Sequence, residues 1–253
     1  MTYRLDSDVP FSLGEVVPRG SGPPRSKGWL RPPAMPIGLA EVLDRSLQGG
    51  DDSDFFYWTS APKNDRIVAW VFNECQSSSW RKKVVDQLAT YITVDVFTSC
   101  GRFTQKVETI PENLIKKYKF YLVFEESFCS DYVSGEFFNV LNHYVVPVVL
   151  GGANYSALAP PLSYIDARDF RSLYHLAEYL KYLAGHRGEY SKFLWWKAYY
   201  SVETPSGLCR LCQKLHERHA PKTYADMAAW WNGLDFCNVS KPQFVDFETV
   251  TTP

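Results

Sequence analysis

The sequence predicts an α/β protein in which a parallel sheet is flanked by helices. From residue 67 onward, short apolar runs typical of buried strands alternate with segments of helical spacing. Strands separated by helices pair in parallel through right-handed crossovers. The stretch 119–152 alone holds a strand, a loop, a helix and a strand in that order, which is the repeating unit of such a sheet.

Five strands are expected. The first, residues 67–72, is a short apolar run, and residues 91–97 (YITVDVF) are β-branched and alternate. Residues 119–124 and 145–150 are further apolar runs, and Tyr164 with Ile165 forms a last short strand. Ligands of parallel sheets bind at the carboxyl ends of the strands. Those ends are expected at 72–76, 97–101, 124–132 and 150–154.

The helices are expected between and after these strands. Residues 78–90 place apolar side chains near helical spacing, with serines available as caps, and residues 135–143 also fit a helix. A longer helical region covers 172–200, with leucines on one face and two glycines that interrupt it. Residues 1–36 are rich in Pro and Gly, and 37–46 form one short helix.

Composition excludes several classes of protein. The 253 residues carry a formal net charge of −1, which gives no reason to expect binding to nucleic acid or to an anionic membrane surface. No signal peptide and no apolar run of about 18 residues is found, so no transmembrane segment is expected in this chain. The 16 Phe, 16 Tyr and 8 Trp suit a packed core and a ring-lined site.

Several motifs, in the right order, resemble the α1,3-fucosyltransferase family over essentially the whole chain. They are MTYRLDSD at residues 1–8, IVAWVFNECQSSSWR at 67–81, YITVDVFTSCG at 91–101 and the 119–152 stretch with FYLVFEES. NYSALAPPLSYIDARDF, YLKYLAGHRGEYSKFLWWK and CRLCQKLH continue the match. The resemblance implies a Rossmann-like parallel sheet flanked by helices, the C-terminal half of a GT-B-type glycosyltransferase.

The resemblance also implies a division of labour. Residues 1–64 would be a lead-in from the interdomain region, and 65–253 the GDP-fucose-binding domain with a helical C-terminal tail. Fucose would pass from GDP-fucose to a glycan of a glycoprotein or glycolipid in α1,3 linkage with inversion, in the Golgi lumen or at its membrane. GDP-fucose is the donor substrate, and no cofactor is expected. No catalytic residue is assigned here, because the resemblance places the base in the acceptor domain.

Positions that match the family receive roles by resemblance. Arg81 would clamp the diphosphate, a task that suits its planar fork of donors. Tyr121, Ser127 and Tyr132 would contact the nucleotide or its phosphates, and two valines would border the guanosine pocket, Val94 and Val96. Without the resemblance, Arg81 would read as a solvated residue on a polar helix face.

Five donor positions depart from the family pattern. Asn73 and Glu74 replace Ser and Asn, and Glu126 replaces an Asn. Gly135 replaces a Glu, and Glu136 replaces a Lys, which changes the local charge by two units. At ~4 Å, a like-charge pair costs roughly 4 kcal/mol at an effective dielectric of 20, and about 1 in bulk water. These departures predict weakened donor binding and slow or absent transfer, unless the substituted side chains point away from the site.

Cysteines, sequons and acidic pairs complete the candidate sites. Six cysteines are disulfide candidates whose pairing stays open: Cys75, Cys100, Cys129, Cys209, Cys212 and Cys237. Asn154 and Asn238 begin glycosylation sequons. No metal is expected: the D-x-D pairs at 6–8 and 52–54 read as solvated turns, and the 209–219 Cys/His group has short spacing for zinc.

Three functional hypotheses remain. The first is a fucosyltransferase donor domain that uses GDP-fucose and a glycan acceptor. The second is a catalytically inactive or truncated relative that acts as a glycan- or partner-binding module. The third is a zinc-stabilised interaction module built on the Cys/His tail, which metal analysis would test.

Overall fold

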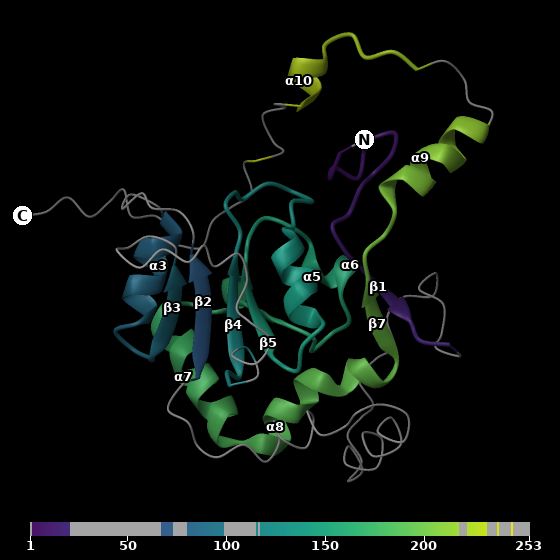
Figure 1. Ribbon diagram of the computed structural model, residues 1–253. Helices are drawn as coiled ribbons and strands as arrows, with labels where there is room; N and C mark the ends of the chain where they lie inside the picture. The colour runs from purple at the N-terminus through teal and green to yellow at the C-terminus, as the bar shows by residue number, and fades with distance from the viewer. Residues whose placement is uncertain are drawn as a thin grey trace, which may run out of the picture.

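The computed structural model describes residues 2–20, 67–72, 80–98, 115, 117–217, 222–231, 237 and 244. These residues build a five-stranded parallel sheet and a separate two-stranded antiparallel ribbon (Figure 1). The parallel sheet has the order β3-β2-β4-β5-β6. Its strands are β2 (Val68–Phe72), β3 (Val94–Thr98), β4 (Phe120–Phe124), β5 (Val146–Leu150) and β6 (Ile165–Asp166). The predicted α/β class is confirmed.

The strand order creates a crevice at one place on the sheet edge. The chain runs outward from β2 to β3, then returns to start again at β4 on the other side of β2. Adjacent helices therefore lie on opposite faces at this point, and the carboxyl ends of β2 and β4 face an open crevice. This crevice is where a parallel sheet of this strand order is expected to bind a ligand.

The three central strands are buried at every position because helices cover both faces of the sheet. Val68, Trp70 and Phe72 of β2 join the core on one face, while Ala69 and Val71 join the core on the other. This alternation is the two-residue period of a strand.

Helices α3 (Trp80–Leu88) and α7 (Leu173–Gly185) pack on one face, and α5 (Gly135–Leu141) packs on the other (Figure 1). The 3₁₀ helix η3 (Lys192–Ala198) contributes side chains to the cores on both faces. The helices expected at 78–90 and 135–143 are present as α3 and α5, and the region expected at 172–200 begins with α7. The 172–200 region breaks once after Gly185, where α8 (Arg187–Ser191) begins. The Ser172 side chain caps α7 by accepting from the His175 N–H.

The N-terminal residues are packed on this domain. Strand β1 (Glu15–Pro18) pairs antiparallel with β7 (Tyr200–Glu203), and Arg4 donates to the main chain of Trp230. Asp8 accepts from the Lys222 ammonium at 2.8 Å. The division expected between residues 64 and 65 stays a prediction, since it lies outside the described residues with the helix expected at 37–46.

The C-terminal tail adds α9 (Gly207–His216) and α10 (Met227–Trp231) beside the N-terminal segment (Figure 1). Helix α6 (Tyr155–Leu158) and the 3₁₀ helix η2 (Ala167–Asp169) lie in the connections on either side of β6. None of the helices formed by the described residues has the length and apolarity needed to cross a membrane.

Candidate functional site

Arg81 lies at the topological crevice. It is the second residue of α3, and its Nη1 donates to the Phe124 carbonyl oxygen at 3.0 Å, at the carboxyl end of β4. Its guanidinium carbon also lies 5.9 Å from the centre of the Phe72 ring, at the end of β2. Arg81 therefore bridges the ends of the two strands that flank the crevice, the position predicted for a diphosphate clamp.

Glu126 stands beside this guanidinium. One of its carboxylate oxygens lies 3.6 Å from Arg81 Nη2, and its side chain is 63% exposed. The main chain of Glu126 is fixed, because its carbonyl accepts from the Trp80 indole N–H at 3.3 Å. An ion pair with so exposed a partner is weak, so the carboxylate is free to swing into solvent while its backbone stays in place.

Glu136 faces the crevice from the first turn of α5. The Tyr121 hydroxyl donates to its carboxylate. Burial raises the pKa of Glu136, while the Tyr121 hydrogen bond and the charge of Arg81 act in the opposite direction. Burial and the Glu136 charge both raise the pKa of Tyr121. Two predicted donor-site residues are thus bound to each other.

Glu125 is a third carboxylate at this edge, and it is buried at 2% exposure. It accepts from the backbone N–H of Ser134 at 3.0 Å and from its hydroxyl at 3.2 Å. Burial raises the pKa of Glu125 to about 7, against the lowering effect of these two hydrogen bonds. Glu125 therefore anchors the start of α5 and is poised to change charge near neutral pH.

Tyr155 closes the site behind Glu125. Its hydroxyl is buried and has no hydrogen-bond partner among the described residues. A Cβ on Gly151 would lie 2.7 Å from this hydroxyl and 2.7 Å from Glu125 Cγ, so only glycine fits between them. The absence of a side chain at Gly151 therefore leaves the buried Tyr155 hydroxyl and the buried Glu125 carboxylate on either side of the same space.

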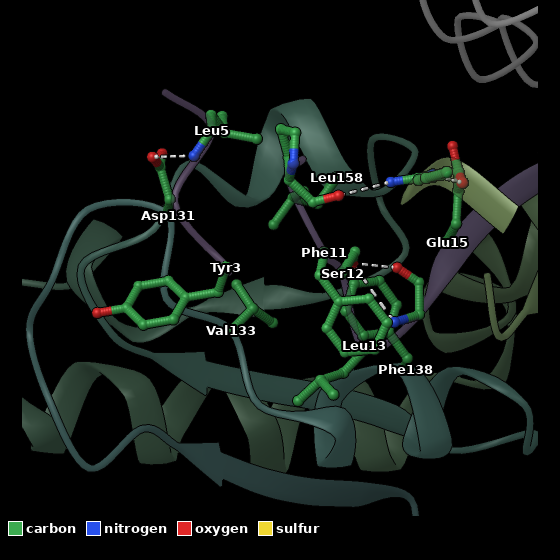
Figure 2. A pocket seen from close by; sticks show the side chains of 13 residues that line it. Tyr3, Leu5, Phe11, Ser12, Leu13, Glu15, Asp131, Val133, Phe138 and Leu158 are labelled. Atoms are coloured by element: carbon green, nitrogen blue, oxygen red, sulfur yellow. Dashed lines mark hydrogen bonds and ion pairs between the residues drawn. The ribbon is translucent and has the colours of Figure 1, made fainter. Parts of the chain in front are cut away.

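The N-terminal segment reaches the loop that carries Tyr132 (Figure 2). The ring of Tyr3 lies edge-on to that of Tyr132, with 5.3 Å between the centroids. Asp131 has a φ of +65° and accepts from the Leu5 N–H at 3.0 Å. The left-handed backbone of Asp131, fixed by this contact, turns the Tyr132 ring toward Tyr3.

Next to this loop is a small hollow of about 130 Å³. The Val133, Phe138 and Leu158 side chains form its apolar wall, and Phe11 and Leu13 of the N-terminal segment point into it (Figure 2). The hollow therefore lies where the N-terminal segment meets the loop that carries Asp131 and Tyr132.

The other predicted donor residues are placed less tightly. Ser127 is exposed in the same loop. Val94 and Val96 lie on the edge strand β3, where Val96 is 45% exposed. A Cβ on Gly135 would lie 3.6 Å from Leu13, an ordinary contact, so the backbone there accepts a side chain. Asn73 and Glu74 lie outside the described residues.

The cysteines divide into two groups. Cys129, in the loop that carries Tyr132, forms a disulfide with Cys237, 108 residues later. Cys209 and Cys212 are free, exposed thiols on α9, so among the described cysteines the pairing that the sequence left open is settled for Cys129 and Cys237 alone. Cys75 and Cys100 lie outside the described residues, as does the sequon residue Asn238, whereas Asn154 is exposed.

Sequence reasoning missed the roles of Glu125, Tyr155 and Tyr3. Glu125 carried a usable signal, because it follows a buried strand directly at the predicted ligand edge. Tyr155 and Tyr3 carried none, since their contacts join segments far apart in the chain.

Residues 61–230 match the family model described as the C-terminal part of glycosyltransferase family 10 (fucosyltransferase). Similar curated proteins include Alpha-(1,3)-fucosyltransferase C of Drosophila melanogaster, 32% identical over 91% of this chain and 53% of that protein. Alpha-(1,3)-fucosyltransferase 4 of Homo sapiens is 33% identical over 91% of this chain and 40% of that protein.

A crystal structure of an alpha1,3-fucosyltransferase with GDP-fucose aligns with a TM-score of 0.46 at 20% identity. The alignment covers 61% of this chain and 48% of that one. The chain spans about half or less of the length of the curated relatives above.

Proposed function

Since the chain belongs to glycosyltransferase family 10, the fucosyltransferases, we propose that it forms the donor-binding part of an α1,3-fucosyltransferase. The donor is GDP-fucose, and the acceptor is a hydroxyl of a glycoprotein or glycolipid glycan. Family membership supports this reading over an inactive glycan- or partner-binding module. The position of Arg81 between the ends of β2 and β4 is the observation that carries the proposal.

This chain acts on the leaving-group side of the reaction. The acceptor oxygen attacks the anomeric carbon of fucose, the bond from that carbon to the GDP oxygen breaks with inversion, and a base takes the acceptor proton. Negative charge then grows on the departing diphosphate. Arg81 stabilises that charge because its guanidinium is held in place by Phe124 before the substrate arrives. The base is not assigned to any residue of this chain.

Glu126 leaves the guanidinium when the donor binds. Its carboxylate is exposed and 3.6 Å away, so a diphosphate oxygen replaces it by a rotation of the side chain alone. Tyr132 and Ser127 lie in the same loop and supply hydroxyl groups to the phosphates or the nucleotide. Val94 and Val96 border the guanine at the edge strand.

The carboxylates lower the affinity for the donor. Glu136 and Glu125 act on Arg81 electrostatically, and both face the region that the diphosphate enters. Their raised pKa values reduce this cost, because a protonated carboxyl does not repel a phosphate. We therefore propose a working but weakened donor site rather than one that has lost its ligand.

The compartment that we propose is the Golgi lumen. A disulfide between Cys129 and Cys237 fits an oxidising lumen, and the exposed Asn154 sequon is accessible to a glycan. Family membership supports the same location.

Isothermal titration calorimetry with GDP-fucose tests the donor. We expect saturable binding by the folded protein, and no binding of UDP-galactose at the same concentrations. The Lys82→Ala variant is the matched control, since Lys82 neighbours Arg81 on α3 but pairs with Asp86 at 2.5 Å. It should bind GDP-fucose like the parent protein.

Two results would contradict the proposal. One is the absence of GDP-fucose binding at millimolar concentration in protein whose circular dichroism shows a folded domain. The other is equal loss of binding in Lys82→Ala and Arg81→Ala, which would mean that general positive charge, not the clamp, holds the nucleotide.

A further inference from the structure

A second concave surface lies at the free edge of the sheet, beside β6. It is an open groove of about 550 Å³, within the roughly 300–1,000 Å³ common for small-ligand sites. Strand β6 pairs only with β5 in the described sheet, and β5 separates it from β4. At ~4.8 Å per strand, β6 lies about 10 Å across the sheet from β4, the strand whose end Arg81 contacts. None of the residues that line the groove belongs to the Arg81 site described above.

Aromatic rings from four parts of the chain line the groove. Phe170 follows η2, and Tyr179 belongs to α7; their ring centroids are 5.4 Å apart with a 44° tilt. Tyr164 precedes β6, and Phe193 of η3 lies at the base, 5% exposed. Half-buried rings side by side offer apolar faces of the size of a sugar ring.

Polar groups that form no hydrogen bond with another described residue lie among these rings. The hydroxyls of Tyr164 and Tyr179 and the carboxylate of Asp169 make no hydrogen bond to other described residues. Asp166, by contrast, is occupied by Arg168, at 2.5 Å. The groove thus presents two hydroxyls and one carboxylate for hydrogen bonds to a ligand, next to apolar ring faces.

One wall of the groove is held in a costly backbone conformation. Leu162 has a φ of +58° and is 38% exposed at the groove. The turn is fixed on both sides, because Ser163 donates to the Pro160 carbonyl and the Trp195 indole N–H donates to the Pro161 carbonyl at 2.8 Å. Non-glycine residues in such conformations cost roughly 1–3 kcal/mol and cluster at ligand sites.

We propose that this groove binds a neutral saccharide, a sugar ring of a glycan that lies outside the transfer site. A sugar has one apolar face for Phe170 and Tyr179 and many hydroxyls for Tyr164, Tyr179 and Asp169. A cation is the other class of ligand that rings and a carboxylate bind. The saccharide is favoured because Tyr164 and Tyr179 add hydroxyl donors, for which a quaternary cation has no acceptor.

Saturation-transfer difference NMR of the protein with lactose and with chitobiose tests the proposal. We expect millimolar binding of at least one of these neutral disaccharides. Tyr179→Phe and Asp169→Ala should each weaken it about fivefold, the effect of one hydrogen bond. Tyr182→Phe is the matched control on the same helix, because its ring lies outside the groove and stacks on His186. That variant should bind the disaccharide like the parent.

The same NMR experiment shows whether disaccharide binding is independent of the donor site. Saturating GDP and the Arg81→Ala substitution should both leave the disaccharide signal unchanged, whatever they do to GDP-fucose binding. The proposal would be overturned if neither disaccharide gave a saturation-transfer signal, or if GDP displaced that signal. Equal disaccharide binding by Tyr179→Phe, Asp169→Ala and Tyr182→Phe would also overturn it. Groove-dependent binding of tetramethylammonium without any disaccharide binding would also overturn it, in favour of a cation site.

Discussion

Two arginines lie near the sheet edge, each beside a carboxylate, and the two pairs differ in geometry. Arg168 donates to both oxygens of Asp166 at 2.5–3.0 Å and to the Ala153 carbonyl at 3.1 Å. Arg81 meets Glu126 at 3.6 Å, with a carboxylate that is 63% exposed against 11% for Asp166. The carboxylate is shielded in one pair and exposed to solvent in the other, whereas both guanidinium groups are largely buried.

The difference separates a structural arginine from one that can exchange its partner. The Asp166 carboxylate also caps the η2 turn by accepting from the Arg168 backbone N–H, so the ion pair holds a carboxylate that fixes the backbone after β6. Glu126 can leave Arg81 without moving the backbone, since its main chain is fixed by Trp80. Proximity to a carboxylate is therefore a poor guide to function, whereas the exposure of that carboxylate is a good one.

The largest expected effect comes from removing the Arg81 side chain. Arg81→Ala should weaken GDP-fucose binding by about 30- to 100-fold, as expected for the loss of charge-assisted hydrogen bonds. Its unfolding free energy should fall by only about 1 kcal/mol, through the lost hydrogen bond to the Phe124 carbonyl. Calorimetry and urea denaturation measure the two effects separately. A large loss of stability with unchanged affinity would reverse the roles of the two arginines.

Removing the Arg168 side chain should act on stability instead. Arg168→Ala leaves a largely buried Asp166 carboxylate without its partner and should lower the unfolding free energy by about 1–2 kcal/mol. Lys181→Ala, which breaks an exposed pair with Glu178, is the control and should change it by less than about 0.5 kcal/mol. Equal midpoints for both variants in urea denaturation would refute this assignment.

Restoring the family pattern around Arg81 should raise the affinity of that site for GDP-fucose. The triple change Glu126→Asn, Gly135→Glu and Glu136→Lys reverses the charge that faces the diphosphate, and the backbone at Gly135 accepts a side chain. GDP-fucose affinity should rise about tenfold, somewhat more than one screened like-charge interaction. Glu178→Lys makes the same two-unit charge change on α7 and should leave the affinity unaltered. No gain in the triple variant would count against the inferred geometry.

The smallest expected effect is on pH dependence. Glu125, with a pKa of about 7, is charged above that pH and neutral below it, so GDP-fucose affinity should rise as the pH falls from 8 to 6. The rise should be about threefold, a repulsion of roughly 0.7 kcal/mol in water. GDP-fucose has no ionisable phosphate proton in this range. Glu125→Gln keeps the acceptor for Ser134 and should flatten the profile; an unchanged slope would exclude Glu125 as its source.

The central strands could be predicted from the sequence because burial on both faces makes them continuous apolar runs. The edge strand β3 was expected at 91–97 but begins at Val94, since the Tyr91 and Ile92 N–H groups both donate to Leu88 and complete the turn after α3. Local hydrogen bonds thus override a β-branched sequence where only one neighbouring strand competes for it.

The candidate site was predictable in part. Arg81 and Tyr121 follow from position in the strand and helix pattern together with the resemblance. The pairing of Tyr121 with Glu136, the burial of Glu125 and the choice of Cys237 as the partner of Cys129 depend on tertiary distances, which no local pattern contains. The residues of the site were therefore easier to predict from the sequence than the side chains to which each one is hydrogen-bonded or disulfide-linked.

The disulfide between Cys129 and Cys237 has a consequence for how the chain responds to cleavage. It closes a covalent loop of 108 residues that includes the strands β5 and β6 and the groove beside them. A protease that cuts once anywhere inside that loop leaves the two pieces joined through sulfur. The nicked protein therefore keeps its full mass until a reductant is added, and only then does the loop that carries Tyr132 part from the tail.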